Sequence, residues 1–394
     1  MDGAVSKQMQ AIIEGLGRFA DLGTSDELWE TLRRPEACDF MFGNPQDLPV
    51  PGYVDALRLG TEPADKYHYA YTMDLPAATA AIGAGLRDRF RLPFRDEDIH
   101  MTNGNFAGLA ILLRLLVDPG DEVIFVSPPW FFYEALIVGS GATPVRVYAA
   151  RTTFDLDLDA IASAITPRTR AILVNSPNNP SGRIYQPALL DELARLLEEA
   201  SARNGRRIFL LSDEAYNRVV FDDRVFPTPV AHYPHSFLIY TYAKTLLSPG
   251  SRLGYIATPP DMPEATEIRT PLLVGQITFG WAFPVAPLQH AVPELEKLSL
   301  DIDKLQRRRD ALVGALRGQG YDAIEPEGTF YILVRSPMND DEAFCKILAS
   351  HDVFVLPGAM FEMPGYFRIS LTASDEMVER GIPGFAKAIA EAGV

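Results

Sequence analysis

The segment SFLIYTYAKTLLSPGSRLGY, residues 236–255, places Lys244 directly after a short apolar run. The run 236–243 is rich in aromatic and aliphatic residues, which is typical of a buried strand. Burial disfavours a charged ammonium, so a lysine at such a strand end is either paired or has a lowered pKa. An uncharged lysine amine is the nucleophile that carbonyl chemistry requires. Taken alone, such a lysine more often extends its charged end to the surface.

Further short apolar runs lie on both sides of this segment and alternate with helix-like stretches. Residues 77–90 and 105–117 carry apolar stripes, and the helix predicted over 189–205 ends at a glycine. Buried strands separated by helices indicate a mostly parallel sheet with helices on its faces, so we predict an α/β fold. The predicted strands are residues 123–126, 171–176, 208–214, 236–243 and 254–258.

The two ends of the chain have a different pattern. Residues 1–40 favour a helical arm, and residues 41–64 favour irregular structure because they carry several prolines and glycines. Beyond residue 284 the pattern indicates a smaller α+β domain. Its predicted elements are a long polar helix over 293–318, a strand over 329–336, a helix near 341–351 and the segment YFRISL. The expected division is residues 1–50 as an arm with part of the small domain, 51–288 as the large domain and 289–394 as the small domain.

Composition excludes several classes of function. The 394 residues carry 36 Lys and Arg against 52 Asp and Glu, a net charge of −16, so no cationic excess is left to neutralise a nucleic acid. No apolar stretch reaches the roughly 18 residues of a membrane helix, and the N-terminus lacks the pattern of a signal peptide. Cys38 and Cys345 lie too far apart for a disulfide framework or a zinc site, so we expect a cytoplasmic protein without a bound metal.

Polar residues gather at the predicted carboxyl ends of the strands, where α/β sheets place their sites. The motif NSPNNPSG (175–182) follows one strand, SDEAY (212–216) ends the next, and Lys244 follows a third. TNGNFAG (102–108) opens the helix over 105–117. Because the ends of parallel strands meet at one edge of a sheet, we expect a common site there.

These motifs, taken in order with YFRIS (366–370), resemble the aminotransferase class I/II family of fold-type I enzymes, which use pyridoxal phosphate (PLP). The similarity runs from about Gly43 to Arg368, and Arg252 stands eight positions after Lys244 (252 − 244). The resemblance implies a large PLP-binding domain with a mostly parallel sheet, a smaller α+β domain, and a homodimer with sites at its interface.

The resemblance also implies roles for individual residues. Lys244 would form the Schiff base with PLP and then act as general base and acid. Asp213 would keep the pyridine nitrogen protonated, which makes the ring an electron sink. Tyr216 would donate a hydrogen bond to O3′, and Asn179 would bind O3′ and the substrate carboxylate. Read without the family, Asp213 would be a helix cap, Tyr216 a core tyrosine and Asn179 a turn residue.

The phosphate of PLP would be held by Thr241, by Arg252 and by the TNGNFAG loop. In that loop Asn105 and Phe106 would offer backbone N–H groups at a helix N-terminus, which favours an anion. Trp130, in SPPWFFYEA, would stack on the pyridine face and border the substrate.

One cofactor contact would come from the partner subunit. Tyr69, in KYHYAYTMDLP, is similar to the tyrosine that crosses the dimer interface to the phosphate of the partner. Asp74 replaces the glycine usual in this segment, so the local turn can differ. Tyr67 or Tyr71 is therefore an alternative for this role.

The implied reaction moves an amino group between an L-amino acid and a 2-oxo acid by a ping-pong mechanism. Arg368 would clamp the substrate α-carboxylate with its planar guanidinium, and the backbone of Gly43 would lie against the substrate. The alternative is a fold-type I PLP enzyme of specialised biosynthesis, namely a lyase, decarboxylase, oxidase or cyclase. The same residues serve all of these reactions, because the cofactor supplies the electron sink.

The side chain of the substrate is indicated by the charge and the aromatic content of the expected site. Aspartate specificity in part of this superfamily depends on a distal cation, and between residues 253 and 303 the cations are Arg269 and Lys297, neither in a matching motif. Aromatic walls bury apolar substrate surface and so favour an apolar or aromatic side chain. The aromatic residues near the expected site are Phe40, Phe42, Phe131, Phe132, Tyr133, Phe279, Trp281 and Phe283.

Overall fold

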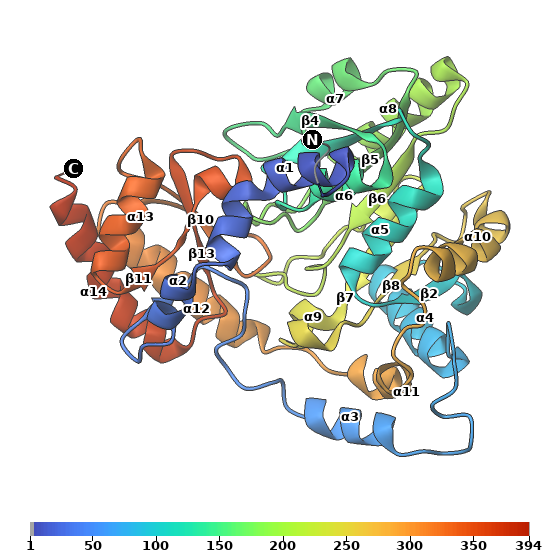
Figure 1. Ribbon diagram of the computed structural model, residues 1–394, viewed down its shortest axis with the longest axis horizontal. Helices are drawn as coiled ribbons and strands as arrows, with labels where there is room; N and C mark the ends of the chain where they lie inside the picture. Colours follow the sequence, from blue (N-terminus) through green and yellow to red (C-terminus); the bar gives the residue numbers. More distant parts are fainter. Residues whose placement is uncertain (1–3, 394) are drawn as a thin grey trace.

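The computed structural model describes residues 4–393, the side chains of residues 18 and 20 excepted, and has a large seven-stranded sheet and a smaller four-stranded sheet (Figure 1). The large sheet has the order β2-β8-β7-β6-β5-β3-β4, and its neighbouring pairs are parallel except the two that involve β8. The predicted mostly parallel sheet is therefore confirmed. Its strands are β2 (Ile99–Thr102), β3 (Glu122–Ser127), β4 (Thr143–Tyr148), β5 (Thr169–Asn175), β6 (Phe209–Asp213), β7 (Ser236–Thr241) and β8 (Gly254–Ala257).

Helices cover both faces of this sheet, and successive strand residues point to opposite faces. In β3, Val123 and Phe125 belong to the core shared with α5 and α6, whereas Ile124 and Val126 belong to the core shared with α7 and α8. This double burial explains why the strands read as continuous apolar runs. The helices are α5 (Asn105–Leu116), α6 (Tyr133–Ser140) and α10 (Ala265–Thr278) on one face, and α7 (Leu158–Ala164) and α8 (Pro187–Asn204) on the other.

The smaller sheet is antiparallel and has the order β12-β13-β10-β9. The N-terminal part of the chain joins this region, because β1 (Cys38–Asp39) pairs in parallel with β11 (Val353–Phe354). The α+β pattern predicted for the C-terminal region is therefore confirmed. Its elements are β9 (Asp322–Ile324), β10 (Tyr331–Arg335), β12 (Leu356–Pro357), β13 (Tyr366–Ser370), α12 (Ile302–Gly318), α13 (Asp341–Ser350) and α14 (Asp375–Glu391).

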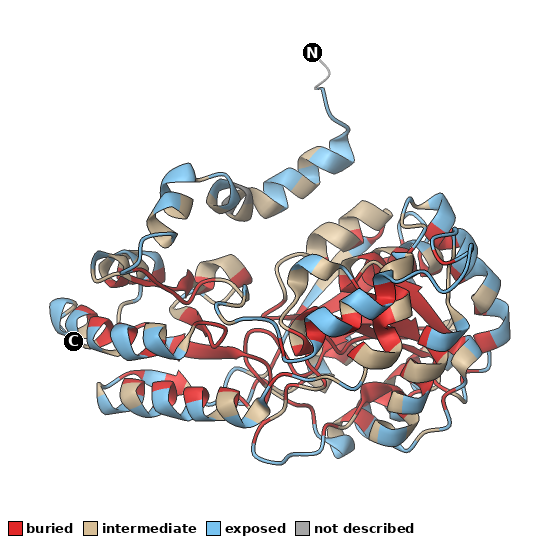
Figure 2. Cartoon of the chain, turned by 90° about the horizontal axis from the view of Figure 1, so that it is seen from below, coloured by how far each residue is buried: buried red, intermediate tan, exposed pale blue. Residues whose placement is uncertain are grey.

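The N-terminal arm consists of two helices, α1 (Lys7–Gly23) and α2 (Asp26–Leu32), and is largely exposed (Figure 2). The arm is fastened to the large sheet region through α6, where the Gln8 side chain donates to the carbonyl of Val138 at 2.8 Å. Within residues 4–393, no helix combines the length and the apolar content that crossing a membrane would require.

Two predictions about helices were wrong. Residues 41–64 are not irregular throughout, because α3 (Tyr53–Thr61) forms there and packs on α11 (Ala286–Leu295), which also packs on α4 (Pro76–Phe90). A side chain at Gly60 would overlap the backbone of Pro287, so the glycine permits this close approach. The single helix predicted over 293–318 is instead the end of α11 and the separate α12, whose N-cap is Asp301.

Candidate functional site

A cavity of about 340 Å³ lies at the carboxyl ends of β5, β6 and β7. The parallel strands bring these ends to one edge of the sheet, as the motifs predicted. Of the predicted site residues, all but Tyr69 line this cavity. They are Gly43, Asn105, Phe106, Trp130, Asn179, Asp213, Tyr216, Thr241, Lys244, Arg252 and Arg368.

Lys244 lies on α9 (Tyr242–Thr245), a single helical turn that starts where β7 ends. The turn begins at Thr241, whose hydroxyl oxygen accepts a hydrogen bond from the backbone N–H of Ala243 at 3.2 Å. Lys244 Nζ is 5.6 Å from the ring centroids of both Tyr216 and Phe330. The lysine amine therefore points into an aromatic part of the cavity rather than to the surface.

Asp213 is the last residue of β6, and both of its carboxylate oxygens accept hydrogen bonds. Oδ2 accepts from the hydroxyl of Tyr133 at 2.6 Å, and Oδ1 accepts from Asn105 Nδ2 at 2.8 Å and from the backbone N–H of Ala215 at 3.2 Å. Burial raises the pKa of Asp213, while these three donors and the charge of Lys244 oppose the rise. The sequence placed Tyr133 among the aromatic residues of the site but did not indicate this bond.

Asn179 and Arg368 also line the cavity and contact each other. Arg368 Nη1 donates to Asn179 Oδ1 at 3.0 Å, and Nη2 donates to the carbonyl of Met41 at 3.0 Å. Arg368 Nε is buried without a hydrogen-bond partner among the described residues, and burial lowers the pKa of this guanidinium. The loop of Asn179 is fixed by Asn175, whose Oδ1 accepts from the Asn179 backbone N–H at 2.7 Å.

Tyr331 belongs to the same site, although no sequence motif indicated it. The Arg368 guanidinium carbon lies 3.9 Å from the centroid of the Tyr331 ring, and a side chain at Gly43 would overlap the Tyr331 hydroxyl. Burial opposes ionisation of Tyr331, but the charges of Arg368 and Lys244 and a hydrogen bond with Tyr216 hold its pKa below the ordinary value. Burial raises the pKa of Tyr216 well above its ordinary value.

The remaining cation of the cavity, Arg252, lies beside the N-terminus of α5. A side chain at Gly104, which has φ +80° and precedes the helix, would come within 2.9 Å of Arg252 Nη2. Backbone N–H groups of Asn105 and Phe106 open the helix at this point, and an anion is stabilised there by the free N–H groups and the helix dipole. This end of the cavity therefore suits a phosphate group.

Aromatic side chains form the outer wall of the cavity. Trp130 and Phe106 meet edge to face with centroids 4.5 Å apart, and Trp29 of α2 stacks on Phe42 at 5.3 Å. Phe19 of α1 stacks on Phe131 at 4.8 Å. The contributions of Phe19 and Trp29 were missed, because nothing in their local sequence shows that the arm returns to the sheet edge.

Four aromatic residues expected at the site do not line this cavity. Phe40 is fully buried in the core against Phe385. Phe279 lies near Arg114, and Phe283 packs against Tyr71. Trp281 is only partly buried against the core of the large sheet. The cavity within one chain therefore does not include these four residues.

Tyr69 is exposed and its hydroxyl donates to the carbonyl of Thr61, away from the cavity of its own chain. Tyr67 and Tyr71 are also exposed. The departure at Asp74 has a structural reason, since its Oδ1 accepts from the backbone N–H of Met101 at 2.6 Å and so ties the segment to β2.

One cavity thus combines a lysine amine, a buried carboxylate, an anion site at a helix N-terminus and a buried arginine, which suits an enzyme that holds an anionic carbonyl cofactor. The sequence profile of the family described as aminotransferase class I and II matches residues 39–384. The chain therefore belongs to this family and is a PLP-dependent aminotransferase, as the resemblance predicted.

Individual relatives agree with the family. The chain is 29% identical to the aspartate/prephenate aminotransferase of Thermus thermophilus over 88% of this chain and 89% of the relative. It is 30% identical to the enzyme of the same name from Cereibacter sphaeroides, over 84% and 86% of the two chains. Among solved structures, an aminotransferase from Eubacterium rectale superposes with a TM-score of 0.86 at 30% identity and covers 99% of this chain and 96% of that one.

The residues of the cavity fit PLP. Two buried polar atoms, Asn105 Oδ1 and Arg368 Nε, lack partners among the described residues, and both belong to residues that line the cavity. Buried polar atoms are almost always hydrogen-bonded in native proteins, so such orphans suit a polar ligand. The cavity also offers an amine at Lys244, a carboxylate at Asp213 and an anion site beside Arg252.

Proposed function

We propose that this aminotransferase takes its amino group from an L-amino acid with an apolar or aromatic side chain. The observation that carries the proposal is the wall of the cavity, which combines Phe19, Trp29 and Phe42 with Phe131 and Phe132. Such walls bury apolar substrate surface at about 25 cal/mol per Å². The names of the relatives mention aspartate, whereas the apolar or aromatic donor proposed for this enzyme is inferred from the cavity of this chain alone.

The cations of the cavity also support an uncharged side chain. Among the residues that line it, the cations are Lys244, Arg252 and Arg368, and each has a proposed role with the cofactor or the α-carboxylate. Arg269 pairs with Glu97 and Asp98 instead of lining the cavity. Among the residues whose side chains the structure describes, none that lines the cavity offers a further cation for a second substrate carboxylate.

The proposed mechanism assigns the proton transfers to Lys244. When bound, PLP supplies an aldehyde for condensation with amines and an electron sink for the substrate α-carbon. Lys244 would hold the cofactor covalently through its Nζ, and the freed Nζ would remove the proton of the substrate α-carbon and deliver it to C4′ of the cofactor. Asp213 would keep the ring nitrogen protonated, and Tyr216 would donate a hydrogen bond from its hydroxyl to O3′.

The remaining proposed roles concern binding. Asn179 and Arg368 would hold the α-carboxylate, with the backbone of Gly43 alongside, and Trp130 would stack on the cofactor ring. The phosphate group is held by Arg252. The other proposed phosphate contacts are Thr241 and the backbone N–H groups of Asn105 and Phe106.

We propose that the enzyme is a homodimer and that Tyr69 reaches the phosphate in the site of the partner. Tyr69 lies outside the cavity of its own chain and is 59% exposed. Exposed apolar side chains from α10 to α11 offer a surface for a second copy. They include Leu273, Val274, Ile277, Phe283 and Val285. Light scattering should give twice the mass of the chain, and an active monomer would contradict the proposal.

The test of the covalent role is borohydride reduction of the PLP-loaded enzyme followed by peptide mass mapping. The reduced adduct is expected on Lys244, and an unlabelled Lys244 would overturn the mechanism. The substrate proposal is tested by single half-reactions with phenylalanine, alanine, aspartate and arginine, followed by loss of the absorbance of the aldehyde form. Phenylalanine is expected to react fastest, and faster reaction of aspartate or arginine would contradict the proposal.

A further inference from the structure

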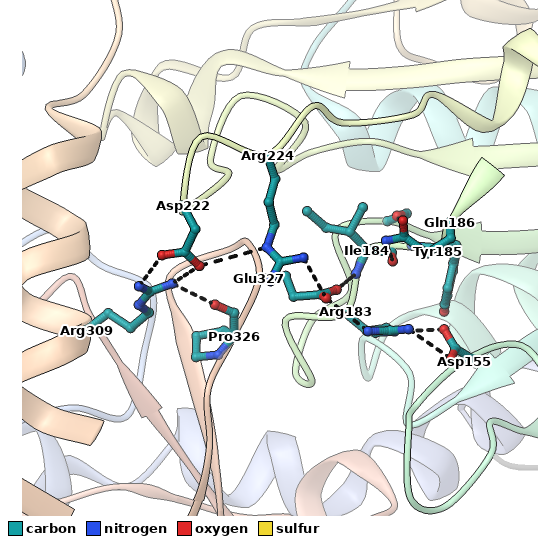
Figure 3. Close-up of polar contacts among 11 residues, drawn as sticks. Asp155, Arg183, Ile184, Tyr185, Gln186, Asp222, Arg224, Arg309, Pro326 and Glu327 are labelled. Carbon is teal, nitrogen blue, oxygen red and sulfur yellow. Dashed lines mark hydrogen bonds and ion pairs between the residues drawn. The ribbon is translucent and has the colours of Figure 1, made fainter. Parts of the chain in front are cut away.

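Glu327 lies where the small sheet meets two loops of the large sheet (Figure 3). Its backbone bridges both loops, since its N–H donates to the carbonyl of Gly182 at 3.1 Å and its carbonyl accepts from Phe221 N–H at 3.0 Å. Two residues further on, Thr329 N–H donates to the carbonyl of Val219 at 2.9 Å. The segment that leads into β10 is therefore held between the two loops.

The side chain of Glu327 strengthens one of these attachments. Oε2 accepts from the backbone N–H of Ile184 at 2.9 Å, and Oε1 accepts from Arg183 Nη1 at 2.9 Å. Arg224 Nη1 lies 3.3 Å from Oε1 on the other loop. The carboxylate is only 15% exposed, so solvent screens these contacts less than it screens surface ion pairs.

Ion pairs extend this arrangement in both directions (Figure 3). Arg183 donates from two nitrogens to Asp155, at 2.7 and 2.9 Å. At the other end, Asp222 accepts two hydrogen bonds from Arg309 of α12, at 2.7 and 2.9 Å. Arg183 thus has a second carboxylate in Asp155, and Arg224 shares Asp222 with Arg309 at 3.8 Å. Glu327 is the acidic residue that joins both loops.

The fastened loop is the one that carries Asn179. Gly182, three residues later, has φ +72°, and a side chain there would overlap Pro326. The loop therefore lies directly on the segment of Glu327. Because Asn179 accepts the hydrogen bond of Arg368, a displacement of this loop changes the pair that faces the substrate carboxylate.

We propose that Glu327 is a positioning residue that holds Asn179, through the loop 175–184, in the geometry required to bind the substrate carboxylate with Arg368. The inference rests on the proposed roles of Asn179 and Arg368. The carboxylate of Glu327 acts by accepting hydrogen bonds and takes no part in proton transfer.

The test compares Glu327→Gln with Glu325→Gln in the PLP-loaded enzyme. Glu325 is a matched control, because it lies two residues away and forms a half-exposed pair with Arg317. Glu327→Gln is expected to raise KM for the best amino-acid donor about tenfold and to change kcat less than about twofold. Amide hydrogen exchange of peptides covering 178–186 is expected to become faster in Glu327→Gln alone.

The outcomes are separable. A KM or an exchange rate of Glu327→Gln equal to that of Glu325→Gln would overturn the inference. If Glu327→Gln does not fold, Arg224→Gln removes the 3.3 Å contact with Glu327 together with a 3.8 Å contact with Asp222, and is expected to raise KM about two- to threefold. An unchanged KM would then overturn the inference. A wild-type enzyme without any half-reaction would instead contradict the proposed function, and the exchange measurement would still decide whether Glu327 fastens the loop.

Discussion

Tyr133 donates its hydroxyl to Asp213 Oδ2 at 2.6 Å, so the carboxylate proposed to face the cofactor nitrogen is itself held by a buried tyrosine. Tyr133 opens α6 and is 2% exposed, and burial raises its pKa well above the ordinary value. The raised pKa favours the protonated hydroxyl, which is the form that donates. This bond favours the charged form of Asp213 against the cost of burial.

Replacement of Tyr133 by Phe should lower kcat about tenfold with little change in KM. Without the donor, the pKa of Asp213 rises further, so its charged form is lost at a higher pH and the acidic limb of the kcat profile moves upward. The pH profile of the half-reaction checks this shift. Tyr148→Phe, at an exposed position on β4, is the control and should leave the profile unchanged. An unshifted pH profile in Tyr133→Phe would show that this hydrogen bond does not affect the pKa of Asp213.

Glu214 should make the enzyme less stable as pH rises. Burial raises the pKa of Glu214 to about 7, although Thr228, Asn217 and Ser212 donate hydrogen bonds to it. Because the folded-state pKa of Glu214 exceeds the ordinary value of 4.5, the folded enzyme binds this proton more tightly than the unfolded chain does. The resulting contribution to the free energy of unfolding is fully present below pH 4.5 and is lost as pH rises through 7. The loss is on the order of 3 kcal/mol.

Glu214→Gln imitates the protonated side chain and should escape this loss. Melting temperatures of the variant and wild type are expected to be similar at pH 5, and the variant is expected to melt higher at pH 8. Glu325→Gln, at a half-exposed position, should have the melting temperature of the wild type at both pH values. A variant that melts below wild type at pH 8 would contradict the assignment of a destabilising buried charge.

Most of the site could be predicted because its residues stand in contiguous motifs at strand ends. Asp213 ends a buried strand, Lys244 stands three residues beyond the end of β7 (244 − 241), and Asn179 stands four beyond the end of β5 (179 − 175). A parallel sheet brings such ends together. The strands themselves could be predicted because they are buried on both faces, and their sequences are therefore continuous apolar runs.

Other parts depend on contacts between distant segments, which local sequence does not encode. Tyr331 faces Arg368 because β10 and β13 pair in the small sheet, and Trp29 reaches the cavity because the arm folds back. The segment that holds α3 is rich in Pro and Gly, yet a helix forms there against α11. In each case tertiary packing overrides the local preference.

Arg368→Lys should raise KM for the amino-acid donor about a hundredfold and leave cofactor binding unchanged. A lysine cannot reproduce the two separate donations to Asn179 and Met41 or the stacking on Tyr331. Half-reaction kinetics and the absorbance of bound cofactor separate the two effects. Arg335→Lys, at an exposed position on the partner strand β10, is the control. Loss of cofactor from Arg368→Lys would show that the arginine has a wider role than substrate binding.

Trp29→Ala should change the preference among amino-acid donors. Trp29 lines the cavity from the arm and stacks on Phe42 at 5.3 Å with an interplanar angle of 17°. Its removal exposes the outer wall and takes away apolar surface that only a large substrate side chain reaches. We expect kcat/KM for phenylalanine to fall about tenfold and that for alanine to stay within about twofold.

Alanine serves as the internal control, because it shares the α-amino and α-carboxylate groups and lacks the large side chain. Leu48→Ala, at a position that is 88% exposed, controls for general effects of substitution near the N-terminus. An equal fall for both donors would indicate that the arm supports catalysis as a whole. An unchanged ratio of the kcat/KM values for phenylalanine and alanine would show that the aromatic wall does not distinguish substrate side chains. If Trp29 contacts the side chain of phenylalanine, its removal must lower kcat/KM for phenylalanine more than for alanine, which lacks that side chain.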